Sequence, residues 1–285
     1  AIAAATVHAN DITPLSDVVR ATLDDLERRQ QARQVGECIG IPTGLQRLDV
    51  LTGGWRGGQL VVLAGRPGMG KSAAMLHFAR TAAVAGVPVC VFSLEMPDTQ
   101  LAGRMVVGGS GVNSGSFRTG DIDADSWRRL EQAAAELSAL PVYFSDCANI
   151  TMGTIRSQCK AMARRGRCGM VIIDYLQLLA DGKAKDRYQA ITGISIALHE
   201  LAQTTGILVV ALAQLNRNAA HAAPSTADLK ESGQLEQDAD AILLLSDDGE
   251  QYRASLDKNK EGRIGILPIA FDKECQRFLE IEERR

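Results

Sequence analysis

Residues 60–72 read LVVLAGRPGMGKS, an apolar run followed by a glycine-rich stretch that ends in lysine and serine. Residues 65–72 match the pattern GxxxxGK(S/T), which lies between a buried strand and a helix in nucleotide-binding proteins. Glycines let the backbone curl so that successive N–H groups point at phosphate oxygens, and the following helix adds the positive end of its dipole. The stretch therefore predicts a strand at Leu60–Ala64, a phosphate-binding loop, and a helix that starts near Lys71.

The residue types in this loop predict contacts with a nucleoside triphosphate. Lys71 is expected to reach the β- and γ-phosphates, and the hydroxyl of Ser72 is expected to bind Mg²⁺. The backbone of the preceding residues would surround the phosphates: Gly65, Arg66, Pro67, Gly68, Met69 and Gly70. The alternative is a glycine-rich turn without a ligand, but the strand before the loop and the helix after it favour the nucleotide site.

The pattern outside the loop predicts an α/β fold. Short apolar runs alternate with stretches of helical periodicity, and the first runs are apolar throughout, as in parallel strands covered on both faces. We therefore expect a doubly wound, mostly parallel sheet with helices on both faces, whose later strands turn antiparallel towards an edge. The expected strands are Leu60–Ala64, Val87–Phe92, Val142–Phe144, Met170–Ile173, Leu208–Ala213, Ala241–Leu245 and Leu267–Phe271, and the expected helices are 71–85, 98–109, 125–139, 152–165 and 187–205.

An amphipathic helix is expected at residues 12–34, ahead of the main domain. One side of this helix is apolar and the other carries Asp, Glu, Arg and Gln. Such a helix could pack on its own domain or dock on a neighbouring subunit. We divide the chain into a tail with this helix at 1–36 and a nucleotide-binding domain at 37–285. The residues at helical spacing are Leu15, Val18, Val19, Thr22 and Leu26.

Composition excludes several classes of protein. The chain has 285 residues, of which 46% are hydrophobic, so it can bury a core without disulfides or metals. Its net charge of −3 excludes a general basic coat for nucleic acid but allows a local basic strip. The six cysteines form no CxxC pair, and no apolar run reaches transmembrane length. We therefore expect a cytoplasmic protein with reduced thiols and no membrane contact.

Polar residues at strand ends are the next candidates, because open α/β sheets bind ligands at the carboxyl ends of their strands. Asp174 ends the run MVIID and fits the acidic residue that holds the Mg²⁺ shell in P-loop ATPases. Glu95 follows VCVFSL and could accept a proton from the attacking water, or it could be a cap or surface residue before Pro97. Gln214 ends LVVALAQ and could either sense the γ-phosphate or simply end the strand.

Taken together, the motifs resemble the C-terminal motor domain of DnaB-type replicative helicases, from about residue 12 to the end of the chain. In family order they are GIPTGLQRLDVLTGGWRGGQLVVLAGRPGMGKS, SLEM, VIIDYLQLL, ALAQLNR and DLKESGQLEQDADAILLL. The resemblance implies a RecA-like fold, with residues 12–34 as the linker helix that packs on the next protomer. The family's N-terminal domain has no counterpart, which implies either a truncated form or a naturally short, phage- or plasmid-like version.

The resemblance assigns roles to the residues named above, and those of the phosphate-binding loop keep theirs. Glu95 resembles the catalytic base, Asp174 the aspartate of the Mg²⁺ shell, and Gln214 the sensor. Arg104 matches a family arginine near the active site, although it could also lie on a solvated helix face.

The segment DLKESG resembles the loop that grips the DNA backbone in the central channel of the family. Lys230 stands where the family usually has Arg, and it could meet a phosphate as a point charge. Glu231 and Gly233 would support the loop. The alternative is an ordinary helix N-terminus with solvated charges.

The chain departs from the family at residues 257–265, DKNKEGRIG. The family has Lys-x-Arg before a glycine turn, and that arginine completes the neighbour's active site. Lys258 matches the family lysine, but Lys260 occupies the arginine position. Either Lys260 acts in trans or Arg263 reaches across from beyond the turn, unless the segment is only a solvated basic turn.

The resemblance implies an ATP-driven ring translocase on single-stranded DNA, the motor of a replicative DNA helicase that uses ATP and Mg²⁺. It implies a homo-oligomer, a hexameric ring with ATP sites between subunits, and it suggests primase and a helicase loader as partners. One alternative is a RecA-like recombination or repair ATPase, which DLKESG and the linker helix disfavour. Another is an ATP-gated assembly module without catalysis, which Glu95 disfavours.

Overall fold

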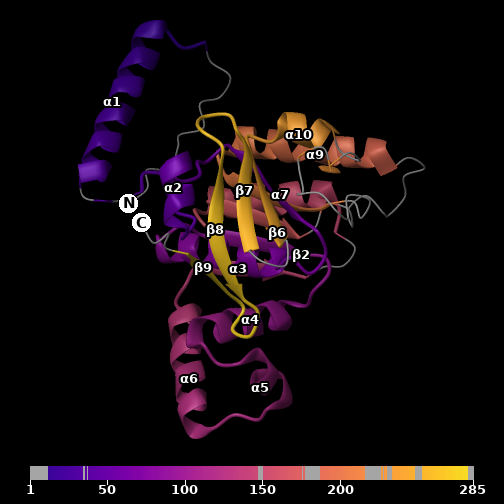
Figure 1. Ribbon diagram of the computed structural model, residues 1–285. Helices are drawn as coiled ribbons and strands as arrows, with labels where there is room; N and C mark the ends of the chain where they lie inside the picture. Colours follow the sequence, from indigo (N-terminus) through magenta and orange to yellow (C-terminus); the bar gives the residue numbers. More distant parts are fainter. Residues whose placement is uncertain are drawn as a thin grey trace.

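The computed structural model describes residues 12–281 except 35, 37, 147–149, 175, 177–186, 216–225, 227, 230–232 and 248–251 (Figure 1). Within these residues a nine-stranded sheet has the order β3-β2-β4-β5-β1-β6-β7-β8-β9. The strands that pair in parallel are β1 (Leu60–Gly65), β2 (Val89–Ser93), β3 (Val142–Ser145), β4 (Met170–Asp174), β5 (Leu208–Gln214) and β6 (Ala241–Asp247). The antiparallel strands beyond β6 are β7 (Tyr252–Asn259), β8 (Gly265–Asp272) and β9 (Arg277–Glu280).

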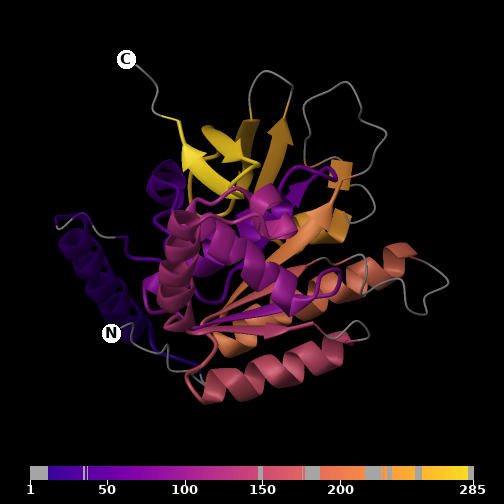
Figure 2. The ribbon, with the colours of Figure 1, turned by 90° about the horizontal axis from the view of Figure 1, so that it is seen from below.

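Helices cover both faces of the parallel part of the sheet. Its central strands are therefore buried along most of their length. Val61 and Leu63 of β1 share a core cluster with α3 (Lys71–Val84) on one face. Val62 and Ala64 point the other way and share a second cluster with α7 (Met152–Arg164) and α9 (Arg187–Thr205). Figure 2 shows these two layers on opposite sides of the sheet. The remaining described helices are α1 (Leu15–Gln34), α2 (Gln46–Thr52), α4 (Asp98–Ser110), α5 (Ser114–Thr119), α6 (Ala124–Ser138) and α10 (Gly233–Asp238).

The predicted doubly wound fold is confirmed, including the antiparallel turn towards one edge. Every expected strand and helix is found, with ends that differ by a few residues; α1 starts at Leu15 and not at residue 12. The sequence prediction missed α2, α5, α10, β7 and β9. The missed helices and β9 are too short to show a period, and β7 alternates buried with half-buried positions.

Two parts stand away from the sheet in Figure 1. One is a helical lobe of α5 and α6, joined to the domain through α4, whose Leu101 and Met105 belong to the core cluster of α3, and the other is α1. The apolar residues of α1 are uncovered: Leu15 is 77% exposed and Leu26 is 59% exposed. In the described part of the chain, no helix combines the length and the apolar character needed to cross a membrane.

Candidate nucleotide site

The loop between β1 and α3 has the shape that its sequence predicts. Gly68 and Gly70 adopt positive φ angles of 82° and 71°, which side chains with a Cβ rarely adopt. Lys71 is the first residue of α3, and its ammonium donates to the carbonyls of Gly65 at 2.9 Å and Arg66 at 3.1 Å. Burial lowers the pKa of Lys71, while nearby carboxylates oppose that shift. The lysine therefore lies folded over the loop, with its charge at the place where phosphates would bind.

Ser72 and Asp174 meet although they lie on different elements. The Ser72 hydroxyl donates to Oδ2 of Asp174 at 3.2 Å. Asp174 is only 1% exposed, and this burial raises its pKa to about 6. The hydrogen bond from Ser72 and the charges of Lys71 and Arg104 act in the opposite direction, whereas the charge of Glu95 adds to the rise. A buried carboxylate thus lies beside the phosphate-binding loop, in a setting that favours a bound cation.

Glu95 lies in a tight turn between β2 and α4. Ser93 holds this turn, because its hydroxyl donates to the carbonyl of Met96 at 2.7 Å and accepts from the N–H of Met96 at 3.1 Å. The N–H of Leu94 donates to the carbonyl of Asp174 at 2.9 Å, which joins the turn to β4. Glu95 is exposed, and its charge acts on both Lys71 and Asp174. An accessible carboxylate therefore lies near the phosphate loop.

Gln214 and Arg104 also lie on the side of the sheet where the parallel strands have their carboxyl ends. Gln214 ends β5, the strand between β1 and β4, and pairs in register with Gly65. Arg104 is half-buried on α4, and its charge lowers the pKa of Asp174. The carboxyl ends of four neighbouring strands thus bring together the residues that the sequence predicted from separate motifs.

The predicted DNA-contacting segment is described only in part. Lys230 and Glu231 lie outside the described residues, whereas Gly233 is the exposed first residue of α10. α10 is tied to α9, because the hydroxyl of Ser195 donates to Oδ2 of Asp238 at 2.7 Å. The segment that contains Lys230 therefore leads directly into a helix anchored on the domain.

The basic turn after β7 lies against the end of α10. The ammonium of Lys258 donates to the carbonyl of Glu236 and, at 3.1 Å, to that of Gln237. The ammonium of Lys260 forms an ion pair with Oδ1 of Asp240 at 2.8 Å. Both lysines thus point to the same side, where they meet the negative end of the α10 dipole.

The register of the sheet separates this turn from the phosphate loop of the same subunit. The N–H of Lys260 donates to the carbonyl of Asp240, at the start of β6, whereas Gly65 pairs with Leu245. Asp240 and Leu245 are five residues apart, roughly 17 Å along a strand. Arg263 is exposed, and its guanidinium makes no hydrogen bond or ion pair within the described part of the chain. The turn therefore lies near the start of β6, at the opposite end of that strand from the phosphate loop of the same subunit.

The donors present suit Mg²⁺ bound together with phosphates. Among the described residues, no group of three or more His, Cys, Asp or Glu is placed to hold a metal ion by itself. Ser72 and Asp174 instead offer one hydroxyl and one carboxylate beside the phosphate loop. Mg²⁺ commonly keeps several waters and binds through one or two carboxylates plus substrate phosphates, so this pair fits it.

Two aromatic residues contact the loop although no sequence motif pointed to them. The hydroxyl of Tyr252 in β7 donates to the carbonyl of Met69. The ring of Phe271 in β8 lies against Gly70. Tyr252 and Met69 are 183 residues apart, and no motif connects them.

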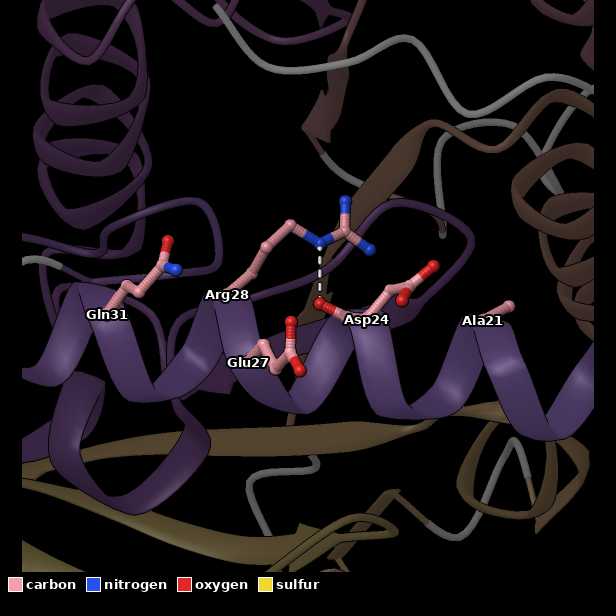
Figure 3. A pocket seen from close by; sticks show the side chains of 5 residues that line it. All are labelled: Ala21, Asp24, Glu27, Arg28 and Gln31. Atoms are coloured by element: carbon pink, nitrogen blue, oxygen red, sulfur yellow. Dashed lines mark hydrogen bonds between the residues drawn. The ribbon is translucent and has the colours of Figure 1, made fainter.

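An open hollow also lies along α1, far from the phosphate loop in sequence (Figure 3). In this hollow Nε of Arg28 donates to the carbonyl of Asp24 at 3.3 Å. All its lining residues belong to α1 itself, so we interpret it as the polar side of the helix and not as a ligand site. They are Ala21, Asp24, Glu27, Arg28 and Gln31.

Comparisons with known proteins agree with this geometry. The model of the DnaB-like helicase C terminal domain matches residues 40–280. The replicative DNA helicase DnaB of Geobacillus stearothermophilus is 34% identical over 97% of this chain and 64% of its own length. The replicative DNA helicase DnaC of Bacillus subtilis (strain 168) is 34% identical over 95% of this chain and 62% of its own length.

Solved structures give the same result. The ATPase domain of G40P has a TM-score of 0.89 at 30% identity, covering 95% of this chain and all of that domain. A DnaB-like replicative helicase described with its interactions with primase has a TM-score of 0.85 at 30% identity, covering 95% of this chain and 68% of that one. The chain spans less than two thirds of the length of the curated relatives named above. It belongs to the family of the DnaB-like helicase C terminal domain.

Proposed function

We propose that this chain is the motor domain of a replicative DNA helicase, an ATP-driven ring that moves along single-stranded DNA. The observation that carries the proposal is the contact of Ser72 with the buried Asp174 beside Lys71, with Glu95 in the adjoining turn. The names of its relatives support it, since they are replicative DNA helicases. Replication of DNA would be a cytoplasmic role, with which the five free cysteines of the described residues agree.

ATP and Mg²⁺ are the ligands that this site fits. Lys71 would leave the carbonyls of Gly65 and Arg66 and turn to the β- and γ-phosphates, which offer it stronger, charge-assisted contacts. Ser72 and Asp174 would hold Mg²⁺, directly or through its waters. When bound, Mg²⁺ supplies positive charge that offsets the charge on the phosphate oxygens.

The protein groups around the γ-phosphate then have distinct tasks. Glu95 would accept a proton from the attacking water, because its carboxylate is accessible and lies near Lys71. Lys71 would stabilise the charge of the phosphoryl group as it transfers. Gln214, at the end of the intervening strand, would contact the γ-phosphate as a neutral amide and respond to its loss. Arg104 would add positive charge beside Asp174.

DNA contact is proposed for the segment before α10. Lys230 would meet a backbone phosphate, with Glu231 and Gly233 shaping the loop, so binding would be tolerant of sequence and sensitive to salt. The contacts of Lys258 with the end of α10 connect this segment to the basic turn. Primase and a helicase loader are further proposed partners, and one solved relative is described with its interactions with primase.

Electron microscopy combined with strand displacement tests the proposed function. With a slowly hydrolysed ATP analogue and an oligonucleotide, we expect closed rings or short spirals. With ATP, the same preparation should displace a strand from a forked duplex, and with the analogue it should not. Long filaments without strand displacement would instead indicate a recombination ATPase. Rings that neither hydrolyse ATP nor unwind DNA would indicate an assembly module.

The exposed apolar stripe of α1 predicts how subunits assemble. We expect it to cover an apolar groove on a neighbouring subunit, since Leu15 and Leu26 are left uncovered in the single chain. Deleting residues 1–36 should therefore weaken oligomers while the motor domain stays folded. Leu26→Ser should raise the dissociation constant of the oligomer about 10-fold or more, given the usual value of one buried leucine. Sedimentation at several protein concentrations measures both effects.

A matched change on the polar side of the same helix is the control. Gln31 is one of the residues that line the hollow in Figure 3, and Gln31→Ser should leave assembly unchanged. If the chain without residues 1–36 forms the same oligomers at the same concentration, α1 does not hold subunits together.

A further inference from the structure

We propose that Tyr252 is a positioning residue for the phosphate-binding loop, where its hydroxyl fixes the peptide group between Met69 and Gly70. The inference rests on the proposed nucleotide site. Tyr252 is the first residue of β7, and its hydroxyl donates a hydrogen bond to the carbonyl oxygen of Met69. The residue is 9% exposed, so most of its side chain is shielded from water.

The geometry of the peptide bond carries this contact to the phosphates. A trans peptide group is planar, and its C=O and N–H point in opposite directions. Holding the carbonyl of Met69 towards β7 therefore turns the N–H of Gly70 away from β7, to the side on which a phosphate-binding loop collects its donors. Gly70 has a φ of 71°, and without a Cβ it would otherwise sample other conformations easily.

Aromatic packing fixes the hydroxyl in place. The rings of Phe271 and Phe278 stack at 4.6 Å with an interplanar angle of 13°, and the ring of Tyr252 lies 5.7 Å from that of Phe271. A Cβ on Gly70 would lie 2.8 Å from the ring of Phe271, so this ring supports the loop directly. The three aromatic residues come from β7, β8 and β9, so the antiparallel strands brace the loop from the side.

Core packing alone does not account for the hydroxyl. A phenylalanine at position 252 would fill the same space, but it would leave the Met69 carbonyl without its donor. Burial, together with the charge of Asp247, raises the pKa of Tyr252, so the phenol keeps the proton that it donates. The hydroxyl is therefore the group to test.

Calorimetric titration of the full chain with ADP and Mg²⁺ provides the test. Tyr252→Phe keeps the ring and removes one oxygen, and we expect ADP to bind about 3- to 10-fold more weakly, the usual effect of one neutral hydrogen bond. The KM for ATP should rise by a similar factor, while kcat at saturating ATP stays within about twofold, because the loop binds ground state and transition state alike. Tyr143→Phe on β3, at the opposite edge of the sheet, is the matched control and should leave both values unchanged.

The titration separates the possible failures. If wild-type protein does not bind ADP, the proposed nucleotide site itself is wrong. If wild-type protein binds and Tyr252→Phe binds equally well, the positioning role is wrong. A lower binding stoichiometry with unchanged affinity would mean that the hydroxyl serves folding alone, which also overturns the inference. Phe271→Leu, which removes the supporting ring but keeps the hydroxyl, should weaken ADP binding as well.

Discussion

Lys260→Ala is expected to lower DNA-stimulated ATP turnover by about 10³-fold, while the protein still binds ATP and single-stranded DNA. An arginine supplied in trans to the γ-phosphate contributes at least this much in related NTPases, and Lys260 would supply the same charge. Lys260 keeps the family spacing from Lys258, and its ammonium lies at the edge of the sheet remote from its own phosphate loop. A steady-state ATPase assay with and without an oligonucleotide measures the loss.

Mixing subunits shows whether the residue acts across an interface. Lys71→Ala and Lys260→Ala proteins should each be inactive alone, because one lacks the phosphate-binding lysine and the other lacks the trans-acting charge. In a mixed ring, some sites combine an intact loop from one protomer with an intact turn from the other, so part of the turnover should return. If both groups acted within one subunit, mixing would restore nothing.

Arg263 is the competing candidate for the same role. Its guanidinium is exposed, while Lys260 must first leave its ion pair with Asp240. Arginine would also offer a planar fork that lysine lacks. Arg263→Ala is nevertheless expected to retain most of the turnover, because Lys260 and not Arg263 stands at the position of the family arginine, two residues after Lys258. If it abolishes turnover while Lys260→Ala does not, Arg263 is the trans-acting residue. If neither change lowers turnover, no basic residue of this turn completes the active site of a neighbouring subunit.

Glu95→Gln is expected to lower ATP turnover by about 10²-fold or more with little change in ATP affinity. The substitution keeps the size of the side chain but removes the base that would take a proton from water, and general-base catalysis usually contributes about 10²- to 10⁴-fold. The turn that carries Glu95 is held by Ser93 and joined to Asp174, so its backbone should not move. Rapid-quench measurement of a single turnover separates the chemical step from nucleotide release.

A second carboxylate-to-amide change controls for general effects of charge. Glu131→Gln on α6 removes an exposed glutamate whose carboxylate accepts a hydrogen bond from the indole N–H of Trp127, and turnover should not change. Near-normal turnover in Glu95→Gln would show that another group takes the proton, and Glu95 would then be a surface residue in the turn before α4.

Much of the candidate site could be predicted because its parts are local patterns. The loop at 65–72 combines glycines, lysine and serine in an order that specifies its own backbone, and Asp174 and Gln214 directly end apolar strands. The carboxyl ends of parallel strands all lie on the same side of the sheet, so such residues gather there whatever the order of the strands. The contact between Ser72 and Asp174 is the observed result of this rule.

The sequence by itself determined the alternation of strands and helices, the phosphate loop and the edge at which its partners lie. It could not determine that Tyr252 meets Met69, that Lys258 and Lys260 meet the end of α10, or that the apolar stripe of α1 is left uncovered. Backbone conformation follows from neighbouring residues, and periodicity reports it within a short window. Contacts between distant segments depend on strand order and register, which only the folded chain establishes. For this reason the sequence alone could identify the basic turn, but only the register of β1 with β6 showed how far the turn lies from its own phosphate loop.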